Sequence, residues 1–282
     1  MRTPWTQVNI TYPGFDRQQR EHHAVDHLAR AFATADAERL VASWFFIRKG
    51  PWRIRYRIAD GADHDPTTGA DPLFPLLTDG FDWHGDIYEP EVHAFGGTAG
   101  MDAAHALFHH DSRHLIAFLS NDATDDRRER SLVLCTALMR AAGLDFNEQG
   151  DVWAKVAEQR PDPTGTSPDP PVWRTFTGDI RHLLLGEARA DLIGDEWLAA
   201  FKGAGETLRS LREGGLLDRG IRAIIALHVI FHWNRLGLPA ATQARLARAA
   251  KEAVFDTAST DRAKLPAQAI TRRLTESAAS PL

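Results

Sequence analysis

The clearest periodic pattern in the chain lies at residues 52–58, where apolar and cationic side chains alternate in the sequence WRIRYRI. A period of two is that of a β-strand, whose successive side chains point to opposite faces of a sheet. This segment is therefore predicted as a strand with one apolar face and one face of three arginines. The apolar run at 41–47 predicts a buried neighbouring strand, and weaker patterns predict strands at 5–12 and 82–88. A stretch rich in Asp, Gly, Pro and Thr predicts a loop before the last of these strands.

Helical spacing replaces this alternation from Gly100 onward. An earlier segment at 16–35 also has helical spacing, with Asp16 placed to cap its N-terminus. In the C-terminal part, helices are predicted at 101–119, 127–142, 150–158, 173–185, 195–212, 220–236 and 240–255. The chain is thus predicted to have an α+β fold, with an N-terminal mixed β-sheet with flanking helices and a largely helical C-terminal half.

The domain organisation follows from the same patterns. We expect one domain over the whole chain, 1–282. Its α/β part extends to about residue 97 and its helical part covers about 98–257, while the Ala-, Ser- and Thr-rich end at 258–282 is expected to fray. The proline-rich stretch 161–171 predicts a loop or linker between helices.

Charge and composition narrow the class of protein. The formal net charge of −5 argues against a protein that mainly neutralises nucleic acid. Hydrophobic residues make up 43% and charged residues 25%, which is the balance of a globular protein with a real core. The single cysteine, Cys135, has no partner for an internal disulfide. No apolar run approaches the roughly 18 residues of a membrane span, so a soluble, cytoplasmic protein is expected.

The three arginines of the 52–58 strand are the first candidates for chemistry. The Cα atoms of Arg53, Arg55 and Arg57 are spaced by about 6.6 Å, because a strand rises roughly 3.3 Å per residue. Guanidinium groups at this spacing can converge on one carboxylate-bearing ligand, each with two hydrogen bonds. Arg48, at the end of the preceding strand, would add a fourth cation. The alternative is a solvated sheet face that binds no ligand.

A second candidate group lies on the predicted helix at 220–236. His228 and His232 are four residues apart and Arg235 follows three residues later, so all three share one helix face. Apolar neighbours would keep this face partly dry, a setting in which a histidine can exchange protons near neutral pH. The alternative is a core histidine that bonds a backbone carbonyl.

Other histidines have the i, i+4 spacing of helical metal ligands. These pairs are His23 with His27, His105 with His109, and His110 with His114. A helical zinc site usually needs a third ligand and a supporting carboxylate, and the sequence has neither an HExxH arrangement nor paired cysteines. We therefore expect neither a metal nor another cofactor.

Four groups of residues, in order along the chain, resemble the motifs of one family. They are WFFIRK at 44–49 with WRIR at 52–55, YEPEVHAFGG at 88–97, AHALFHHDSR at 104–113 and HWNRLG at 232–237. On these motifs the chain resembles the thiopeptide-type bacteriocin biosynthesis domain. That domain is similar to the C-terminal elimination domain of class I lantibiotic dehydratases.

The resemblance implies a role in the biosynthesis of a ribosomally made peptide antibiotic. In such systems a partner enzyme esterifies Ser or Thr of a precursor peptide with glutamate from glutamyl-tRNA. The elimination domain then acts as a lyase that expels glutamate and leaves dehydroalanine or dehydrobutyrine. Two alternatives stay open, namely a [4+2] cyclase that forms the pyridine core of a thiopeptide and a non-catalytic partner of the glutamylating subunit.

The same resemblance implies which molecules the protein meets. The expected partners are the precursor peptide, with its leader and its core, and the tRNA-dependent glutamylating dehydratase subunit. A homodimer is a further option. Direct contact with nucleic acid or with a membrane is not expected.

The resemblance also implies roles for particular residues. By position, Arg53, Arg55 and His232 are expected to be catalytic, with their side-chain tips within about 10 Å if they form one site. Pro90 and Ala94 depart from the family pattern, because they stand where lantibiotic dehydratases carry further arginines. Substrate binding is expected from the motif residues Arg48, Glu91, Asp111, Ser112, Asn234 and Arg235.

Overall fold

The computed structural model describes residues 4–62, 71–121, 126–163, 169–186 and 193–256. The chain divides into two compact units. We call residues 1–90 with 105–123 the sheet unit, and residues 91–104 with 124–282 the helical unit. Helix α3 (Thr98–Leu119) crosses this boundary, so its first turns belong to the helical unit and the remainder to the sheet unit.

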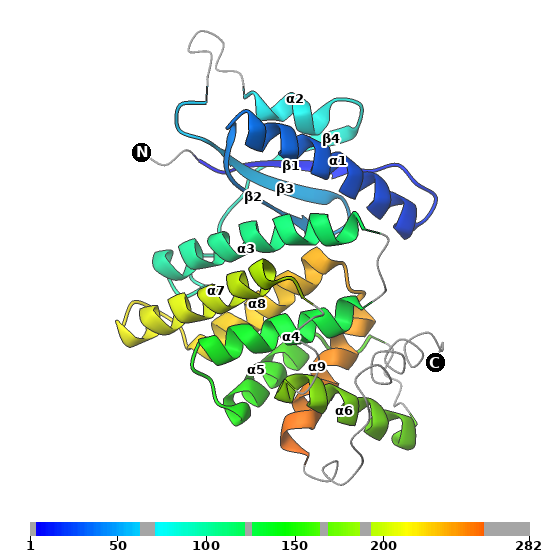
Figure 1. Ribbon diagram of the computed structural model, residues 1–282, viewed down its shortest axis with the longest axis vertical. Helices are drawn as coiled ribbons and strands as arrows, with labels where there is room; N and C mark the ends of the chain where they lie inside the picture. Colours follow the sequence, from blue (N-terminus) through cyan, green and yellow to red (C-terminus); the bar gives the residue numbers. More distant parts are fainter. Residues whose placement is uncertain (1–3, 63–70, 122–125, 164–168, 187–192, 257–282) are drawn as a thin grey trace. The chain divides into compact units, whose positions relative to one another are not determined.

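The sheet unit contains the four strands that the sequence predicts (Figure 1). They are β1 (Thr6–Thr11), β2 (Val41–Arg48), β3 (Trp52–Ile58) and β4 (Asp82–Asp86), in the spatial order β2-β3-β1-β4. The prediction of a mixed sheet is wrong in one respect, because every neighbouring pair is antiparallel. Strands β1 and β2 do run in the same direction, but β3 lies between them and pairs with both.

One face of this sheet packs against helix α1 (Arg17–Ala37). The ring of Phe32 on α1 stacks on Trp44 of β2 with 3.6 Å between the ring centroids. Helix α1 begins where the sequence predicts, because the Asp16 side chain accepts a hydrogen bond from the amide of Gln19. The buried residues of β3 are Trp52, Ile54, Tyr56 and Ile58. Their alternation leaves the arginines of β3 on the opposite face.

Strand β2 forms one edge of the sheet, and α3 covers that edge. The amide of Trp44 donates to Nδ1 of His109 at 3.2 Å, and the amide of Phe46 donates to Oγ of Ser112 at 3.3 Å. Covering an edge in this way prevents it from pairing with a strand of another chain. The short helix α2 (Leu73–Thr78) also belongs to this unit, in a segment for which the sequence predicts only a loop.

Six helices and the start of α3 make up the described part of the helical unit (Figure 1). They are α4 (Arg127–Ala141), α5 (Phe146–Gln159), α6 (Pro170–Leu185), α7 (Asp195–Glu213), α8 (Ile221–Leu236) and α9 (Ala240–Phe255). Helix α8 is buried on nearly all sides, and its Trp233 stacks on Trp153 of α5. Helix α5 begins earlier than the sequence predicts, because Asp145 and Glu148 form a capping box ahead of it.

The α+β class and the largely helical C-terminal half are confirmed. The expected frayed end at 258–282 and the centre of the proline-rich stretch, 164–168, lie outside the described residues. The last residues of that stretch, Pro170 and Pro171, open helix α6, where the missing amide hydrogen of proline costs nothing. Within the described parts of the chain, no helix is both long and apolar enough to cross a membrane.

Close packing of α4 and α7 gives a prediction about stability. In Gly205→Ala the new Cβ would lie 2.4 Å from the carbonyl oxygen of Leu138 and 2.8 Å from the Cβ of Ala141. We expect the free energy of unfolding to fall by about 1–3 kcal/mol. Gly203 lies on the same helix with open space at its Cβ position, so Gly203→Ala should gain up to about 1 kcal/mol. Thermal unfolding measures both, and equal Tm values would contradict this packing.

Candidate functional site: an arginine-bearing sheet face

The face of the sheet opposite α1 carries polar side chains in register across three strands. Antiparallel pairing places Asn9 of β1 opposite Arg53 and Gln7 opposite Arg55. On the far side of β1, His84 and Asp86 of β4 lie opposite Asn9 and Gln7. We call Arg53, Arg55 and Arg57 together with Gln7, Asn9, His84 and Asp86 the arginine face. The three arginines are half-buried, so their guanidinium groups remain within reach of a ligand.

Hydrogen bonds fix the geometry of this face. Nε of Arg55 donates to Oε1 of Gln7 at 2.7 Å, and Nε2 of Gln7 donates to Oδ2 of Asp86 at 2.9 Å. Nδ2 of Asn9 lies 3.2 Å from the same carboxylate oxygen and 2.9 Å from Nε2 of His84. Gln7 and Asn9 are only 4% and 2% exposed. These two buried amides therefore hold Arg55 and Asp86 in defined positions.

Asp86 is the carboxylate of the arginine face. The hydrogen bond from Asn9 lowers the pKa of Asp86, and the amide of Ile87 and the charge of Arg53 lower it further. Asp86 is therefore ionised at neutral pH. One carboxylate beside three guanidinium groups leaves the face with an excess of positive charge, which suits an anionic ligand.

Aromatic rings surround the arginines on the side of β2. The guanidinium carbon of Arg55 lies 4.1 Å from the ring centroid of Tyr88 and 5.4 Å from that of Phe45. The guanidinium of Arg57 lies 4.9 Å from the ring of Trp5. Such contacts orient a guanidinium group without using its hydrogen-bond donors. Among the described residues, the buried Nε atoms of Arg53 and Arg57 have no hydrogen-bond partner.

Arg48 does not join the arginine face. Its register partner is Trp52, and its guanidinium lies over the Trp52 ring on the face that packs against α1. There it forms an ion pair with Glu21 of α1, and its side chain is only 8% exposed. The hairpin register explains this placement. Arg48 lies opposite Trp52, and the side chain of Trp52 points to the other face of the sheet from Arg53 and Arg55.

Asp111 and Ser112 lie in the part of α3 that belongs to the sheet unit. Both side chains are fully buried. The hydroxyl of Ser112 accepts the amide hydrogen bond of Phe46 described above, so it stabilises the edge of β2. Their expected role in substrate binding stays a prediction.

The helical unit holds the second candidate group, and α8 places its members on one face as predicted. His228, His232 and Arg235 are 2%, 1% and 0% exposed. His228 stacks on Phe95, and His232 meets the edge of Phe201 with 5.1 Å between the centroids. Oδ1 of Asn234 accepts a hydrogen bond from Gln243. Because His232 and the arginine face belong to different units, the expected shared site stays a prediction.

The segment in which the family pattern is broken has its own cation. Nη1 of Arg219 donates to the backbone carbonyl of Ala94 at 3.0 Å. The neighbouring Asp218 donates its amide to Gly96, and a Cβ at Gly97 would lie 2.7 Å from the Asp218 carboxylate. The absence of a side chain at Gly97 thus lets Asp218 approach closely. Glu91, at the start of this segment, is exposed.

Four of the six histidines with helical metal-ligand spacing make hydrogen bonds within the sheet unit. His23 bonds the carbonyl of Pro13, His27 bonds Tyr12 and the carbonyl of Leu76, and His105 bonds Tyr88. Burial lowers the pKa of His109 to about 4, so this imidazole is neutral beside the backbone of Trp44. Over the described ranges, no group of three or more His, Cys, Asp or Glu residues is placed to hold a metal ion.

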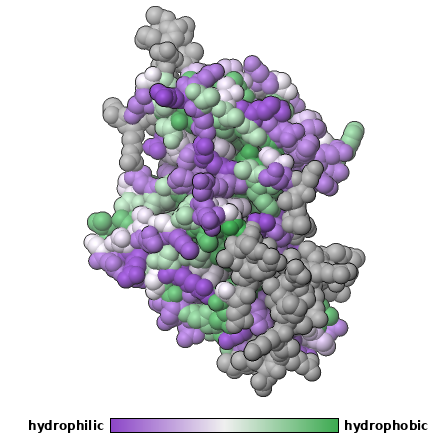
Figure 2. Space-filling view, in the orientation of Figure 1, coloured by the Kyte–Doolittle hydropathy of each residue, from purple (hydrophilic) through white to green (hydrophobic). Residues whose placement is uncertain are grey.

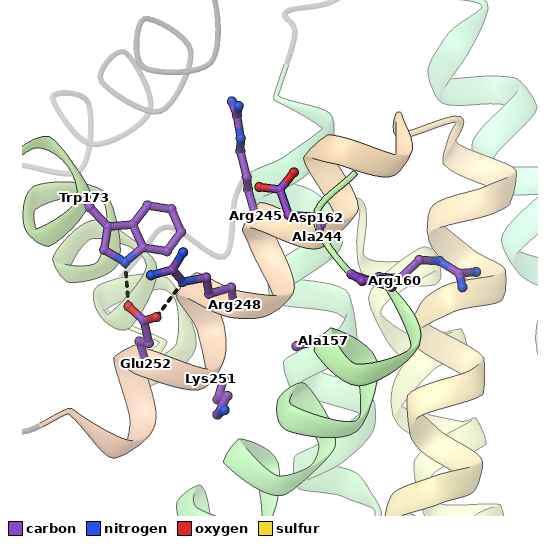
Figure 3. A pocket seen from close by; sticks show the side chains of 10 residues that line it. Ala157, Arg160, Asp162, Trp173, Ala244, Arg245, Arg248, Lys251 and Glu252 are labelled. Carbon is purple, nitrogen blue, oxygen red and sulfur yellow. Dashed lines mark hydrogen bonds and ion pairs between the residues drawn. The ribbon is translucent and has the colours of Figure 1, made fainter. Parts of the chain in front are cut away.

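A second cluster of cations lines a pocket of about 260 Å³ in the helical unit (Figure 3). Glu252 in its wall accepts hydrogen bonds from Nε1 of Trp173 at 2.5 Å and from Nε of Arg248 at 2.8 Å. The residues that the sequence singles out do not line this pocket. Its cations are Arg160, Arg245, Arg248 and Lys251.

Sequence reasoning identifies the arginines but misses the residues that hold them. Gln7, Asn9, His84 and Asp86 belong to strands far from β3 in the sequence, and their role depends on the pairing register. The sequence holds a weak signal for this polar cluster, because the polar Gln7 and Asn9 alternate with the apolar Val8 and Ile10 in a buried strand. Buried amides at alternate positions of a strand indicate a polar cluster on one face.

Comparisons with solved structures agree with this architecture. The lantibiotic dehydratase MibB from Microbispora sp. 107891, described as tRNA-dependent, matches with 20% identity and a TM-score of 0.59. The match covers 92% of this chain and 29% of the MibB chain, so this protein corresponds to less than a third of MibB. The structure of TsrL matches with 15% identity and a TM-score of 0.60, over 96% of this chain and 98% of TsrL. At these identities the likeness shows a shared fold.

The comparison with protein families is more direct, because one family model spans most of the chain. The family described as "Lantibiotic biosynthesis dehydratase C-term" matches residues 5–254. The chain therefore belongs to this family, which confirms the resemblance seen in its motifs and assigns it to antibiotic peptide biosynthesis. A search of curated proteins finds no significant match.

Proposed function

We propose that this protein eliminates glutamate from glutamylated Ser or Thr of a ribosomally made precursor peptide, leaving dehydroalanine or dehydrobutyrine. The observation that carries the proposal is the arginine face. Its cations outnumber its single carboxylate, Arg55 is held in place by Gln7, and the buried Nε of Arg53 has no acceptor among the described residues. Such a face can receive the free carboxylate of a glutamyl ester and the carboxylate that is released as the ester breaks.

The reaction needs two kinds of help. A base must remove the Cα proton, and cations must stabilise the negative charge that leaves with glutamate. Arg53 and Arg55 are proposed for the second task, because guanidinium stays protonated at any working pH and cannot be the base. His232 is proposed for proton transfer, as base or as acid toward the leaving group, because imidazole is the side chain most often used for general acid–base catalysis.

The departure at Ala94 does not remove every cation from that segment. Arg219 brings a guanidinium to the backbone of Ala94 from the turn before α8. We propose that Arg219 contributes the positive charge that lantibiotic dehydratases place within the segment itself. This supports elimination despite the broken motif.

The alternatives rest on other features. A cyclase would need a wide pocket with few cations, and the ordered arginines favour elimination over cyclisation.

A docking role is favoured by exposed apolar side chains at the β4 end of the sheet unit, where Trp83 is 46% and Ile87 83% exposed. Hydrophilic residues cover much of the visible surface in Figure 2, with smaller apolar areas between them. Contact with a glutamylating subunit is compatible with catalysis, so the docking role supplements the proposal.

The deciding experiment incubates the purified protein with a synthetic peptide that carries one glutamylated Ser. We expect mass spectrometry to show loss of one glutamic acid, giving a product lighter than the unmodified peptide by one water. A second peptide with two dehydroalanines tests the cyclase alternative in parallel. Conversion of the second peptide alone would overturn the proposal in favour of cyclisation, and conversion of neither would favour the docking role.

A further inference from the structure

Two Tyr–His pairs lie in the sheet unit, and they differ in their surroundings. In the first, the hydroxyl of Tyr12 lies 2.9 Å from Nδ1 of His27. In the second, the hydroxyl of Tyr88 lies 2.8 Å from Nε2 of His105. The first pair serves as a reference for what such a pair does when it only stabilises the fold.

The Tyr12–His27 pair is built into the core. Tyr12 is 3% exposed, and burial raises its pKa well above the usual value. The second nitrogen of His27 is engaged by the carbonyl of Leu76 at 3.0 Å, and burial lowers the pKa of His27. Within the described residues, no charged side chain stacks on the ring of Tyr12 or of His27. This pair is therefore fixed in one neutral hydrogen-bonded state.

The Tyr88–His105 pair lies beside the arginine face. The guanidinium carbon of Arg55 is 4.1 Å from the centroid of the Tyr88 ring. Tyr88 is half-buried, in contrast to Tyr12, and follows the exposed Ile87 at the end of β4. His105 is 7% exposed, and the centroid of its ring lies 4.6 Å from that of Trp5. A cation over the ring stabilises negative charge that develops on the phenolic oxygen as it gives up a proton.

We infer that Tyr88, relayed by His105, takes the Cα proton of the glutamylated residue. This inference rests on the proposed function and deepens it. As the Cα–H bond breaks, its proton passes to the Tyr88 oxygen while the phenolic proton passes to Nε2 of His105. The electron pair of that bond forms the Cα=Cβ double bond, and the Cβ–O bond breaks with its pair leaving on the glutamate carboxylate. His105 then returns the proton to solvent, and glutamate leaves as the carboxylate.

The contact with Arg55 makes the Tyr88–His105 pair suitable for removing the Cα proton. Arg55 is fixed on one side by Gln7 and on the other by the Tyr88 ring. A carboxylate bound by Arg55 would therefore bring the rest of the glutamylated residue close to the Tyr88 hydroxyl. β-Elimination requires a proton acceptor near the Cα proton and a cation near the leaving carboxylate, and this arrangement brings the two together.

The experiment compares Tyr88→Phe with Tyr12→Phe in the full-length protein and the glutamylated Ser peptide. Tyr88→Phe keeps the ring under Arg55 and removes only the oxygen. We expect kcat to fall by about 100-fold, with KM and Tm unchanged. We also expect the Cα-deuterium isotope effect on kcat to increase, because proton removal then limits the rate. Tyr12→Phe should keep the parental kcat. His105→Gln should lose activity as Tyr88→Phe does.

The outcomes separate this inference from the proposed function. If the parental protein does not eliminate glutamate, the proposed function fails and the inference fails with it. If the parent eliminates and Tyr88→Phe matches its kcat, the inference alone is overturned. A loss of kcat in Tyr88→Phe with an unchanged isotope effect would also overturn it, because a merely structural role would leave the proton-transfer step as it was.

Discussion

Arg53→Lys is expected to lower kcat/KM for glutamate elimination by about 100- to 1,000-fold, although it preserves the positive charge. A guanidinium presents two parallel donors to a carboxylate, whereas an ammonium is a point donor on a more flexible stem. Nε of Arg53 is buried and has no acceptor within the described residues, so the two terminal nitrogens of this half-buried side chain are the donors proposed to meet the leaving group. Lysine has only one such nitrogen. The loss should appear mainly in kcat, because the charge on the leaving carboxylate develops in the transition state.

Arg57→Lys is the matched control. Arg57 lies on the same strand and the same face, but its guanidinium packs over Trp5 at 4.9 Å and it is not among the residues expected to be catalytic. Its replacement should cost much less activity. Because both changes keep the charge of the face, equal losses for Arg53→Lys and Arg57→Lys would show that Arg53 has no role beyond that of its neighbour.

Local periodicity explains why so much of the fold is predictable. The alternation in β3 and the apolar run in β2 each depend on neighbours in the sequence, and both strands lie where the pattern places them. Helix α1 likewise begins at the cap that Asp16 provides. Such elements are determined by residues within one or two turns of each other, so a single sequence is enough to find them.

Pairing between distant segments is harder to predict. Strand order depends on which edges meet in space, and the insertion of β3 between β1 and β2 makes the sheet antiparallel where a mixed one is predicted. The same limit applies to Arg48. Its position near Arg53 in the sequence suggests a shared face, but the hairpin register assigns it to the face of Glu21. A shift of one residue reverses the side of the sheet on which a side chain lies.

The candidate site contains residues that local periodicity predicts and residues that only the pairing of distant segments brings together. The arginines are visible in the sequence because they alternate with apolar residues, and α8 places His228, His232 and Arg235 together because of helical spacing. The Tyr88–His105 pair joins residues 17 positions apart, on a loop and a helix, so no periodic pattern indicates it. Contacts that complete a site across elements are found only when the fold is known.

His232→Phe is expected to stop turnover, by about 1,000-fold in kcat, while it preserves the fold and the binding of glutamylated peptide. The imidazole lies among aromatic side chains, with Phe201 at 5.1 Å and Trp197 at 6.4 Å between ring centroids. A phenyl ring keeps those edge contacts and fills a similar volume. It cannot hold or release a proton. The glutamylated intermediate should therefore accumulate, and mass spectrometry should show peptide that carries glutamate without loss of water.

His228→Phe is the control for this last change, because it alters the same helix one turn earlier. His228 is as buried as His232 and stacks on Phe95, but the family resemblance assigns it no proton transfer. A loss confined to His232→Phe, with equal Tm for both variants, would support a chemical role for that imidazole. If His232→Phe eliminates at the parental rate, His232 is not a proton carrier. The proton chemistry would then rest on Tyr88 and His105, with Glu91 and Asp111 as the next carboxylates to replace.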